Sequence, residues 1–141
     1  MSEGWLIQKN IVIIGGTGGM GLSAAKAFVA QGARVVVVGR NSQTCDAAQQ
    51  QLGEKGVAIC ADAIDPSAAE NAINICVQQF GTFHGLYHVA GGSGRKMGDG
   101  PLHELTLAGW NKTFELNLTS LMLSNQAAIK WLLKHKAGGS I

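Results

Sequence analysis

Short apolar runs alternate along the chain with longer segments that are rich in Ala and polar residues. The apolar runs cover residues 10–14, 34–38, 57–61 and 85–89. The segments between them have the length of helices and cover residues 19–31, 42–53 and 66–80. Because the runs are apolar at nearly every position, they suit parallel strands that are covered on both faces. The pattern predicts repeated βα units.

The second half of the chain is less regular. Residues 91–101 are Gly-rich and are expected to form an extended loop. From 102 to 136 the pattern predicts a mainly helical region in two pieces that break near Ala108 and Gly109, and the segment 137–139 then ends the helix.

Right-handed crossovers place the four strands in one Rossmann-like, doubly wound parallel sheet of the α/β class, with strand order 3-2-1-4. This sheet is incomplete, because the fourth strand keeps an unpaired edge and residues 140–141 stand where a fifth strand would begin. We therefore expect residues 1–141 to form a single domain that is truncated at the start of strand five. An apolar strand edge of this kind also favours association.

The composition is that of an ordinary folded domain, with 46% apolar and 14% charged residues. The net charge of +2 is too small for binding to phosphate backbones, so no nucleic-acid partner is expected. The longest apolar runs fall far short of the roughly 20 residues that a membrane span needs. The first ten residues lack the features of a secretory signal. We therefore expect a cytoplasmic protein with no membrane partner.

The three cysteines, Cys45, Cys60 and Cys76, are widely spaced and odd in number. This spacing gives neither a disulfide framework nor a CxxC motif, so we expect small buried residues. The histidines show no spacing that resembles a metal site.

A Gly-rich turn joins the first predicted strand to the first predicted helix. A turn at this place lets the backbone approach a pyrophosphate, while the helix start presents free N–H groups and a positive dipole end. The candidate phosphate-binding residues are Gly15, Thr17, Gly18, Gly19, Met20 and Gly21. A flexible loop in a Gly-rich chain is the alternative, but the strand before the turn and the helix after it favour a dinucleotide site.

The end of the second strand bears on coenzyme choice. The sequence there is Gly39-Arg40-Asn41, which offers no carboxylate to a free ribose 2′-hydroxyl. Arg40 instead offers a cationic fork, and a charged hydrogen bond of this kind is worth roughly 1.5–3 kcal/mol. We therefore expect Arg40 and Asn41 to contact the coenzyme and to favour NADP over NAD. A solvated surface arginine is the alternative.

With these residues in view, almost the whole chain resembles the N-terminal part of a short-chain dehydrogenase/reductase. The pattern Gly15-x-x-x-Gly19-x-Gly21 matches the glycine motif of that family. The resemblance implies that Asp62 and Ala63 contact the adenine, although Asp62 could instead only polarise a turn.

Two further motifs of the family match in part. Ala90 and Gly91 match the second half of its Asn-Asn-Ala-Gly motif, where the resemblance implies coenzyme contact. His88 and Val89 stand where the two asparagines are usual. We expect His88 to be a hydrogen-bonded core residue rather than a general base. The segment around Asn117 resembles the one that carries the family's catalytic Asn, so the resemblance implies a part in the proton relay.

The family's catalytic Ser, Tyr and Lys have no counterpart in these 141 residues. The only Tyr, Tyr87, is followed four positions later by Gly91 instead of Lys. We therefore expect no turnover by this chain alone. The resemblance implies that the complete protein, if longer, is an NADP-dependent oxidoreductase that interconverts a small-molecule carbonyl and an alcohol.

Two other functions remain open. One is a nucleotide-binding or sensing module without catalysis. The other is an interaction protein whose helices within 102–136 pair between subunits, as corresponding helices do in the resembling family. We expect a homo-oligomer, although the Leu-rich stretch of this region could equally be core within one chain.

Overall fold

The computed structural model describes residues 4–141 and contains one parallel four-stranded sheet. The strands are β1 (Asn10–Ile14), β2 (Arg34–Gly39), β3 (Gly56–Cys60) and β4 (Gly85–His88). Their order is β3-β2-β1-β4, and every neighbouring pair is parallel. The Rossmann-like order predicted from the sequence is confirmed, and each strand starts and ends within one residue of its predicted range.

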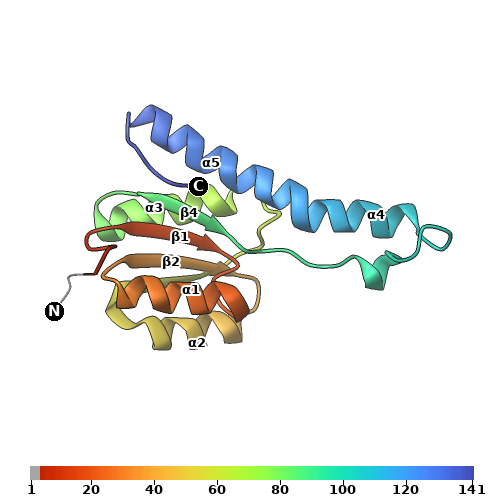
Figure 1. Ribbon diagram of the computed structural model, residues 1–141, viewed down its shortest axis with the longest axis horizontal. Helices are drawn as coiled ribbons and strands as arrows, with labels where there is room; N and C mark the ends of the chain where they lie inside the picture. The colour runs from red at the N-terminus through yellow and green to blue at the C-terminus, as the bar shows by residue number, and fades with distance from the viewer. Residues whose placement is uncertain (1–3) are drawn as a thin grey trace.

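Helices cover both faces of the sheet (Figure 1). Helices α1 (Gly19–Ala30) and α2 (Ser42–Leu52) lie on one face, and α3 (Ala68–Phe80) and α5 (Ser120–Lys134) lie on the other. Two short 3-10 helices, η1 (Gly53–Lys55) and η2 (Arg95–Met97), lie in the connections. Gly81 ends α3 in the left-handed conformation, as is common after a helix.

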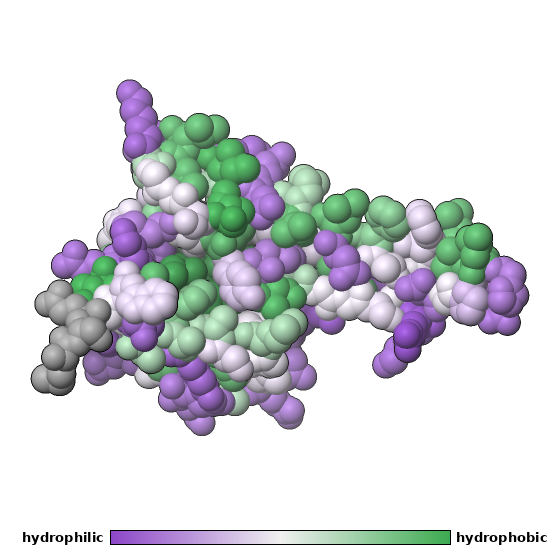
Figure 2. Space-filling model, viewed as in Figure 1, coloured by the Kyte–Doolittle hydropathy of each residue, from purple (hydrophilic) through white to green (hydrophobic). Residues whose placement is uncertain are grey.

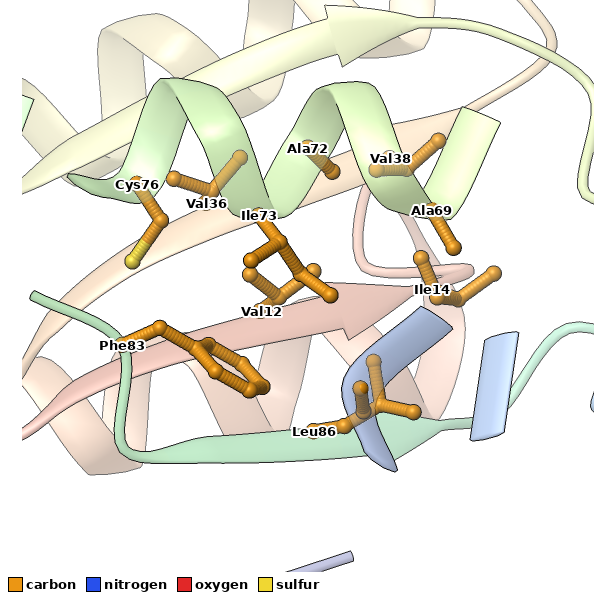
Figure 3. Packing of buried hydrophobic residues seen from close by; sticks show 11 residues of the cluster. Val12, Ile14, Val36, Val38, Ala69, Ala72, Ile73, Cys76, Phe83 and Leu86 are labelled. Atoms are coloured by element: carbon orange, nitrogen blue, oxygen red, sulfur yellow. The ribbon is translucent and has the colours of Figure 1, made fainter. Parts of the chain in front are cut away.

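The two faces of the sheet bury separate apolar clusters, because successive strand side chains point to opposite sides. On the α3 side, Val12, Val36 and Leu86 pack with Ile73 and Phe83 (Figure 3). The cluster on the other side contains Ile13, Ala25, Ala33, Val35, Val37, Ala48 and Leu52. Full burial of one such aliphatic side chain contributes about 1.5–3 kcal/mol. The two clusters thus hold the carboxyl ends of the strands in fixed positions.

The cysteines differ in their exposure. Cys45 and Cys76 are buried, as expected, whereas Cys60 is exposed. The prediction of burial was wrong for Cys60 because it is the last residue of β3, the edge strand, where the helix cover ends.

The C-terminal helical region departs from its predicted form. It starts at α4 (Leu107–Phe114), passes through a π-helical turn, η3 (Glu115–Thr119), and continues into α5 without interruption. Residues 102–106 are not helical, and there is no break near Ala108 and Gly109.

Two contacts explain why α4 begins where it does. The Thr106 hydroxyl accepts a hydrogen bond from the Gly109 N–H at 3.0 Å and so caps the helix. Gly109 lies in the first turn because the backbone of Gly98 and Asp99 passes where a Cβ atom would be. The glycine therefore serves a close backbone contact and does not break the helix.

Near the C-terminal end, the chain enters the sheet on the free side of β4. The Ser140 N–H donates to the His84 carbonyl at 3.1 Å, and the Ser140 carbonyl accepts from the Leu86 N–H at 2.9 Å. This single parallel bridge lies where the sequence predicts a fifth strand to start.

Candidate functional site

A cavity of about 360 Å³ lies at the carboxyl ends of the strands, where the β1–α1 turn meets the ends of β2, β3 and β4. In a doubly wound sheet this edge, at the point where the strand order reverses, is the place where ligands bind. Most of the predicted coenzyme-binding residues line the cavity, namely Gly15, Thr17, Gly18, Met20, Gly21, Arg40, Asp62, Ala63, Ala90 and Gly91. Gly19 and Asn41 are not part of the lining.

The glycines of the β1–α1 turn are required by close backbone contacts. Gly15 has φ +86°, and a Cβ atom there would lie 2.6 Å from the Ala90 backbone nitrogen. A Cβ atom on Gly21 would overlap the Gly15 carbonyl. Gly19 has φ +49° and opens α1, so it shapes the turn from outside the cavity lining.

The start of α1 has the chemistry of an anion site. Gly18 is the N-cap residue, its backbone is extended, and no side chain caps the helix. The first N–H groups of α1 therefore keep their hydrogen-bonding capacity, and the helix dipole favours negative charge there. Since a Cβ atom on Gly18 would meet no atom within 4 Å, open space lies next to this helix start. A pyrophosphate fits these residues.

Two threonines tie the turn to α2. The Thr17 hydroxyl lies 3.2 Å from the Thr44 hydroxyl, and a side chain at Gly39 would overlap Thr17. The Asn41 carboxamide oxygen accepts from the Thr44 N–H at 3.1 Å and caps α2. Asn41 is thus engaged as a helix cap, which explains its position outside the cavity lining.

Arg40 and Asp62 face each other at the ends of β2 and β3. The Arg40 guanidinium lies 3.9 Å from the Asp62 carboxylate, and both side chains are exposed, by 62% and 40%. The other Asp62 oxygen accepts from the Ile64 N–H at 3.2 Å. Asp62 therefore does polarise the turn that follows β3, yet its second oxygen is still directed toward Arg40 and the cavity.

His88 is held by hydrogen bonds on both ring nitrogens. Nε2 lies 2.9 Å from the Ala90 carbonyl, and Nδ1 lies 2.8 Å from the Ser124 hydroxyl. A carbonyl can only accept, so Nε2 carries a proton. The Ser124 hydroxyl has one hydrogen, which it shares between Nδ1 of the neutral ring and the Leu121 carbonyl, 3.0 Å away. Burial lowers the pKa of His88, which also favours the neutral form. These contacts agree with a core histidine and fix the end of β4 beside Ala90.

Asn117 connects the π-helical turn to the loop after β4. Its amide nitrogen donates to the Gly92 carbonyl at 2.6 Å and to the Thr113 carbonyl at 2.8 Å. Its oxygen accepts from the Gly92 N–H at 3.1 Å. A Cβ atom on Gly91 would lie 2.6 Å from that oxygen. Asn117 does not line the cavity, but it holds in place the glycine loop that does.

The remaining lining residues were missed by sequence reasoning. They are Ile14, Val38, Gly39, Ala61, Ile64, Val89, Leu116 and Ser120. The strand-end residues among them are adjacent to predicted site residues, so their place in the sequence was a usable signal. Leu116 and Ser120 come from η3 and α5. They lie beside Asn117, so the family resemblance of that segment was the signal that could have found them.

Metal and membrane features are not seen in residues 4–141. No group of three or more His, Cys, Asp or Glu side chains in this part of the chain is placed to hold a metal ion. None of the helices described there combines the length and the apolar character that a membrane crossing demands.

Comparison with known proteins gives consistent matches along the chain. The family model for short chain dehydrogenases matches residues 9–141. The 2,5-dichloro-2,5-cyclohexadiene-1,4-diol dehydrogenase of Sphingobium indicum is 32% identical over an alignment of 139 positions, which covers 96% of this chain and 54% of the relative. The 3-alpha-(or 20-beta)-hydroxysteroid dehydrogenase of Mycobacterium bovis is 30% identical over 139 residues, or 99% of this chain and 52% of that one.

Solved structures show the same arrangement. A short chain dehydrogenase from Bacillus anthracis superposes with a TM-score of 0.83 at 25% identity and covers 94% of this chain and 53% of its own. A short-chain type dehydrogenase/reductase from Mycobacterium ulcerans has a TM-score of 0.84 at 26% identity, with 96% and 50% covered. The chain thus spans about half the length of the relatives that it matches. With its glycine turn, strand order and family match in agreement, the chain belongs to the short-chain dehydrogenase/reductase family.

Proposed function

We propose that this chain is the NADP(H)-binding part of an oxidoreductase that transfers hydride between the coenzyme and a carbonyl or alcohol substrate. Membership of a dehydrogenase family supports oxidoreductase chemistry that uses a nicotinamide coenzyme. The observation that carries the choice of NADP is Arg40, which lies at the end of β2 on the cavity wall, where the segment 39–41 has no carboxylate.

The proposed binding mode assigns one part of the coenzyme to each part of the cavity. The pyrophosphate lies on the start of α1, between Gly15 and Gly21, and the adenine lies near Asp62 and Ala63. Arg40 binds the 2′-phosphate through charged hydrogen bonds. The nicotinamide end lies toward Ala90 and Gly91, and it supplies the hydride when the coenzyme is bound.

Asn117 is the candidate member of the catalytic machinery. Two of its hydrogen bonds hold the Gly92 backbone against η3 and the third goes to the Thr113 carbonyl, so it fixes the loop beside the proposed nicotinamide end. A π-helical turn within an α-helix is often found at a functional site. We propose that Asn117 organises this end of the site for proton transfer.

The 141 residues contain no counterpart of the Tyr and Lys that the family uses for proton transfer. Tyr87 packs against Phe28, with ring centroids 6.1 Å apart, and Gly91 follows it at the fourth position. General acid–base catalysis needs a positioned proton donor. We therefore propose that this polypeptide binds coenzyme without appreciable turnover.

The test compares coenzyme binding with turnover in the same sample. Calorimetric titration of the 141-residue chain with NADPH and NADH is expected to show tighter binding of NADPH. A panel of aldehydes, ketones and alcohols is expected to give no change in absorbance of the coenzyme. Equal affinity for the two coenzymes contradicts the NADP assignment. Measurable turnover contradicts the proposal that this chain binds the coenzyme without catalysing the reaction.

We also propose that the chain self-associates through its long helical region. Large exposed apolar side chains occur along α4, η3 and α5, and Figure 2 shows apolar surface along this region. They are Leu107, Trp110, Phe114, Leu118, Met122, Ile129 and Leu133. An exposed apolar stripe of this kind is typical of an interaction surface. In Figure 1, α4 extends beyond the edge of the sheet, which leaves its outer face accessible.

A further inference from the structure

Two cysteines lie close to the end of β2, next to residues that line the candidate site. Cys45 lies in the first turn of α2, and Cys60 is the last residue of β3. Each sulfur contacts a carbonyl at the end of β2, that of Gly39 for Cys45 and that of Arg40 for Cys60. In the β2–β3 register Cys60 pairs with Gly39, the residue before Arg40. The two thiols therefore lie against consecutive carbonyls of one strand end, although 14 residues separate them in the sequence.

Both thiols also contact the backbone that carries Arg40. The Cys45 sulfur lies 3.5 Å from the Gly39 carbonyl and 3.5 Å from the Ile59 carbonyl. The Cys60 sulfur lies 3.4 Å from the Arg40 carbonyl. A thiol is a weak donor with a single hydrogen, so Cys45 donates to one of its two carbonyls at a time, while Cys60 can donate to the Arg40 carbonyl. The redox state of the two thiols therefore affects the hydrogen bonds of the backbone at the end of β2.

The two cysteines differ in access. Cys60 is exposed and can meet a solute, whereas Cys45 is buried. Burial is the main cause that raises the pKa of Cys45. The third cysteine, Cys76, is buried near the Thr82 carbonyl, and burial raises its pKa to about 12. An oxidant in solution therefore meets Cys60 first, and Cys45 is the neighbour that can complete a disulfide.

We propose that Cys45 and Cys60 form a redox-active dithiol that is oxidised to a disulfide by low-molecular-weight disulfides. The Cys60 thiolate attacks one sulfur of the small disulfide, forms a mixed disulfide and releases one small thiol. The Cys45 thiolate then attacks the Cys60 sulfur, forms the Cys45–Cys60 bond and releases the second small thiol. The protein loses two electrons and two protons, and the small disulfide gains both.

Oxidation removes thiol hydrogen bonds from the backbone that carries the Arg40 side chain. The disulfide has no S–H group, so the Arg40 carbonyl loses its thiol donor and the Gly39 carbonyl loses the one that it shares with Ile59. The Gly39 carbonyl keeps its bond from the Ala61 N–H at 2.9 Å, but no other bond to the Arg40 carbonyl is present among residues 4–141. The backbone at Arg40 is therefore the part that becomes less constrained. If NADPH binds as proposed above, oxidation weakens its binding about three- to tenfold.

The experiment uses the 141-residue chain before and after exposure to oxidised glutathione. Free thiols are alkylated, and peptide mapping by mass spectrometry locates the disulfide. The expected product is a Cys45–Cys60 bond, with Cys76 alkylated only after unfolding. NADPH binding is measured by fluorescence titration in both states, and dithiothreitol is expected to restore the initial affinity. A stable mixed disulfide on Cys60, or unmodified thiols, overturns the proposal.

Two single variants keep the test selective. In Cys45→Ser the oxidant is expected to stop at the mixed disulfide on Cys60, because the second thiol is missing. In Cys76→Ala the Cys45–Cys60 bond is expected to form as in the unchanged chain. The experiment distinguishes an error in the proposed disulfide from an error in the proposed NADPH site. A disulfide that forms in a chain with no NADPH affinity refutes only the latter, and unchanged affinity after complete oxidation refutes the link to Arg40.

Discussion

The Arg40 guanidinium lies 3.9 Å from the Asp62 carboxylate, across the end of the cavity where β2 and β3 stop. Both side chains are well exposed, so the pair adds little to stability. A phosphate carries more charge than a carboxylate and matches the guanidinium with two parallel hydrogen bonds. Arg40 can therefore exchange its weak ion pair for a stronger one without a large change in position.

The first prediction concerns Arg40→Ala. This change is expected to weaken NADPH binding by about ten- to a hundredfold and to leave NADH binding nearly unchanged, because only NADPH carries the 2′-phosphate. Calorimetry with both coenzymes measures the difference. Arg95→Ala, in η2 away from the cavity lining, is the matched control. Equal losses for the two coenzymes would remove the assignment of Arg40.

Much of this site was predictable because it depends on residues that follow strands. The Gly-rich turn, Arg40 and Asp62 each come directly after an apolar run, and parallel strands bring their carboxyl ends to one edge. The sequence could not show that Asn41 uses its oxygen to cap α2. Nor could it show that the sulfurs of Cys45 and Cys60 lie at the same strand end, since their positions depend on how α2 packs on β3.

The helical region was predicted less well, for a related reason. Gly109 has the sequence signature of a helix break, but it lies in the first turn of α4 because another segment passes close by. The real irregularity is the π-helical turn around Asn117, where the Asn side chain holds Gly92. Both features come from tertiary contacts that local propensity does not record.

A second prediction tests the shape of the turn. Gly15→Ala is expected to destabilise the fold, by roughly 1–2 kcal/mol from the positive φ alone. It should also abolish coenzyme binding, because the added methyl group displaces Ala90. Urea unfolding and NADPH titration measure the two effects. Gly100→Ala, where the added Cβ meets no atom within 4 Å, is expected to change neither. Full NADPH affinity in Gly15→Ala would show that the turn does not shape the site.

The third prediction concerns the dependence of stability on pH. Burial lowers the pKa of His88 and of His84 in the folded chain below the ordinary value of 6.5. Protonation therefore favours the unfolded chain, so stability is complete above about pH 6.5 and decreases as the pH falls from there toward the folded pKa values. Urea unfolding between pH 5 and 8 is expected to show this decrease.

The variant His88→Asn separates the contribution of His88 from that of His84. The decrease in stability below about pH 6.5 is expected to become shallower, because one of the two titrating groups is removed. An NMR titration of the His88 ring gives an independent measure of its pKa. A His88 pKa above 6.5 would contradict the neutral, hydrogen-bonded ring.

The fourth prediction concerns Asn117→Ala. Loss of the bonds to Gly92 is expected to lower stability by about 1–3 kcal/mol and to make the loop after β4 mobile. Hydrogen exchange at residues 91–94 should rise, and coenzyme affinity should fall less than in Gly15→Ala. Asn111→Ala is the control, because Asn111 is exposed and lies on the same helical region. Unchanged exchange in Asn117→Ala would mean that other contacts hold the loop.

The last prediction tests self-association through the exposed apolar stripe. Leu118 is 55% exposed and lies near the middle of the long helical region. If two copies pair along this face, Leu118→Glu places a charge in an apolar interface, where an unpaired charge is strongly unfavourable. Light scattering over a range of concentrations is expected to show an oligomer for the unchanged chain and a monomer for Leu118→Glu. Leu102→Glu is the control, because Leu102 is 86% exposed but lies outside the helices. If association persists in Leu118→Glu, the outer edge of β4 becomes the better explanation, since the single bridge at Ser140 covers it only in part and an open apolar edge also recruits a second chain.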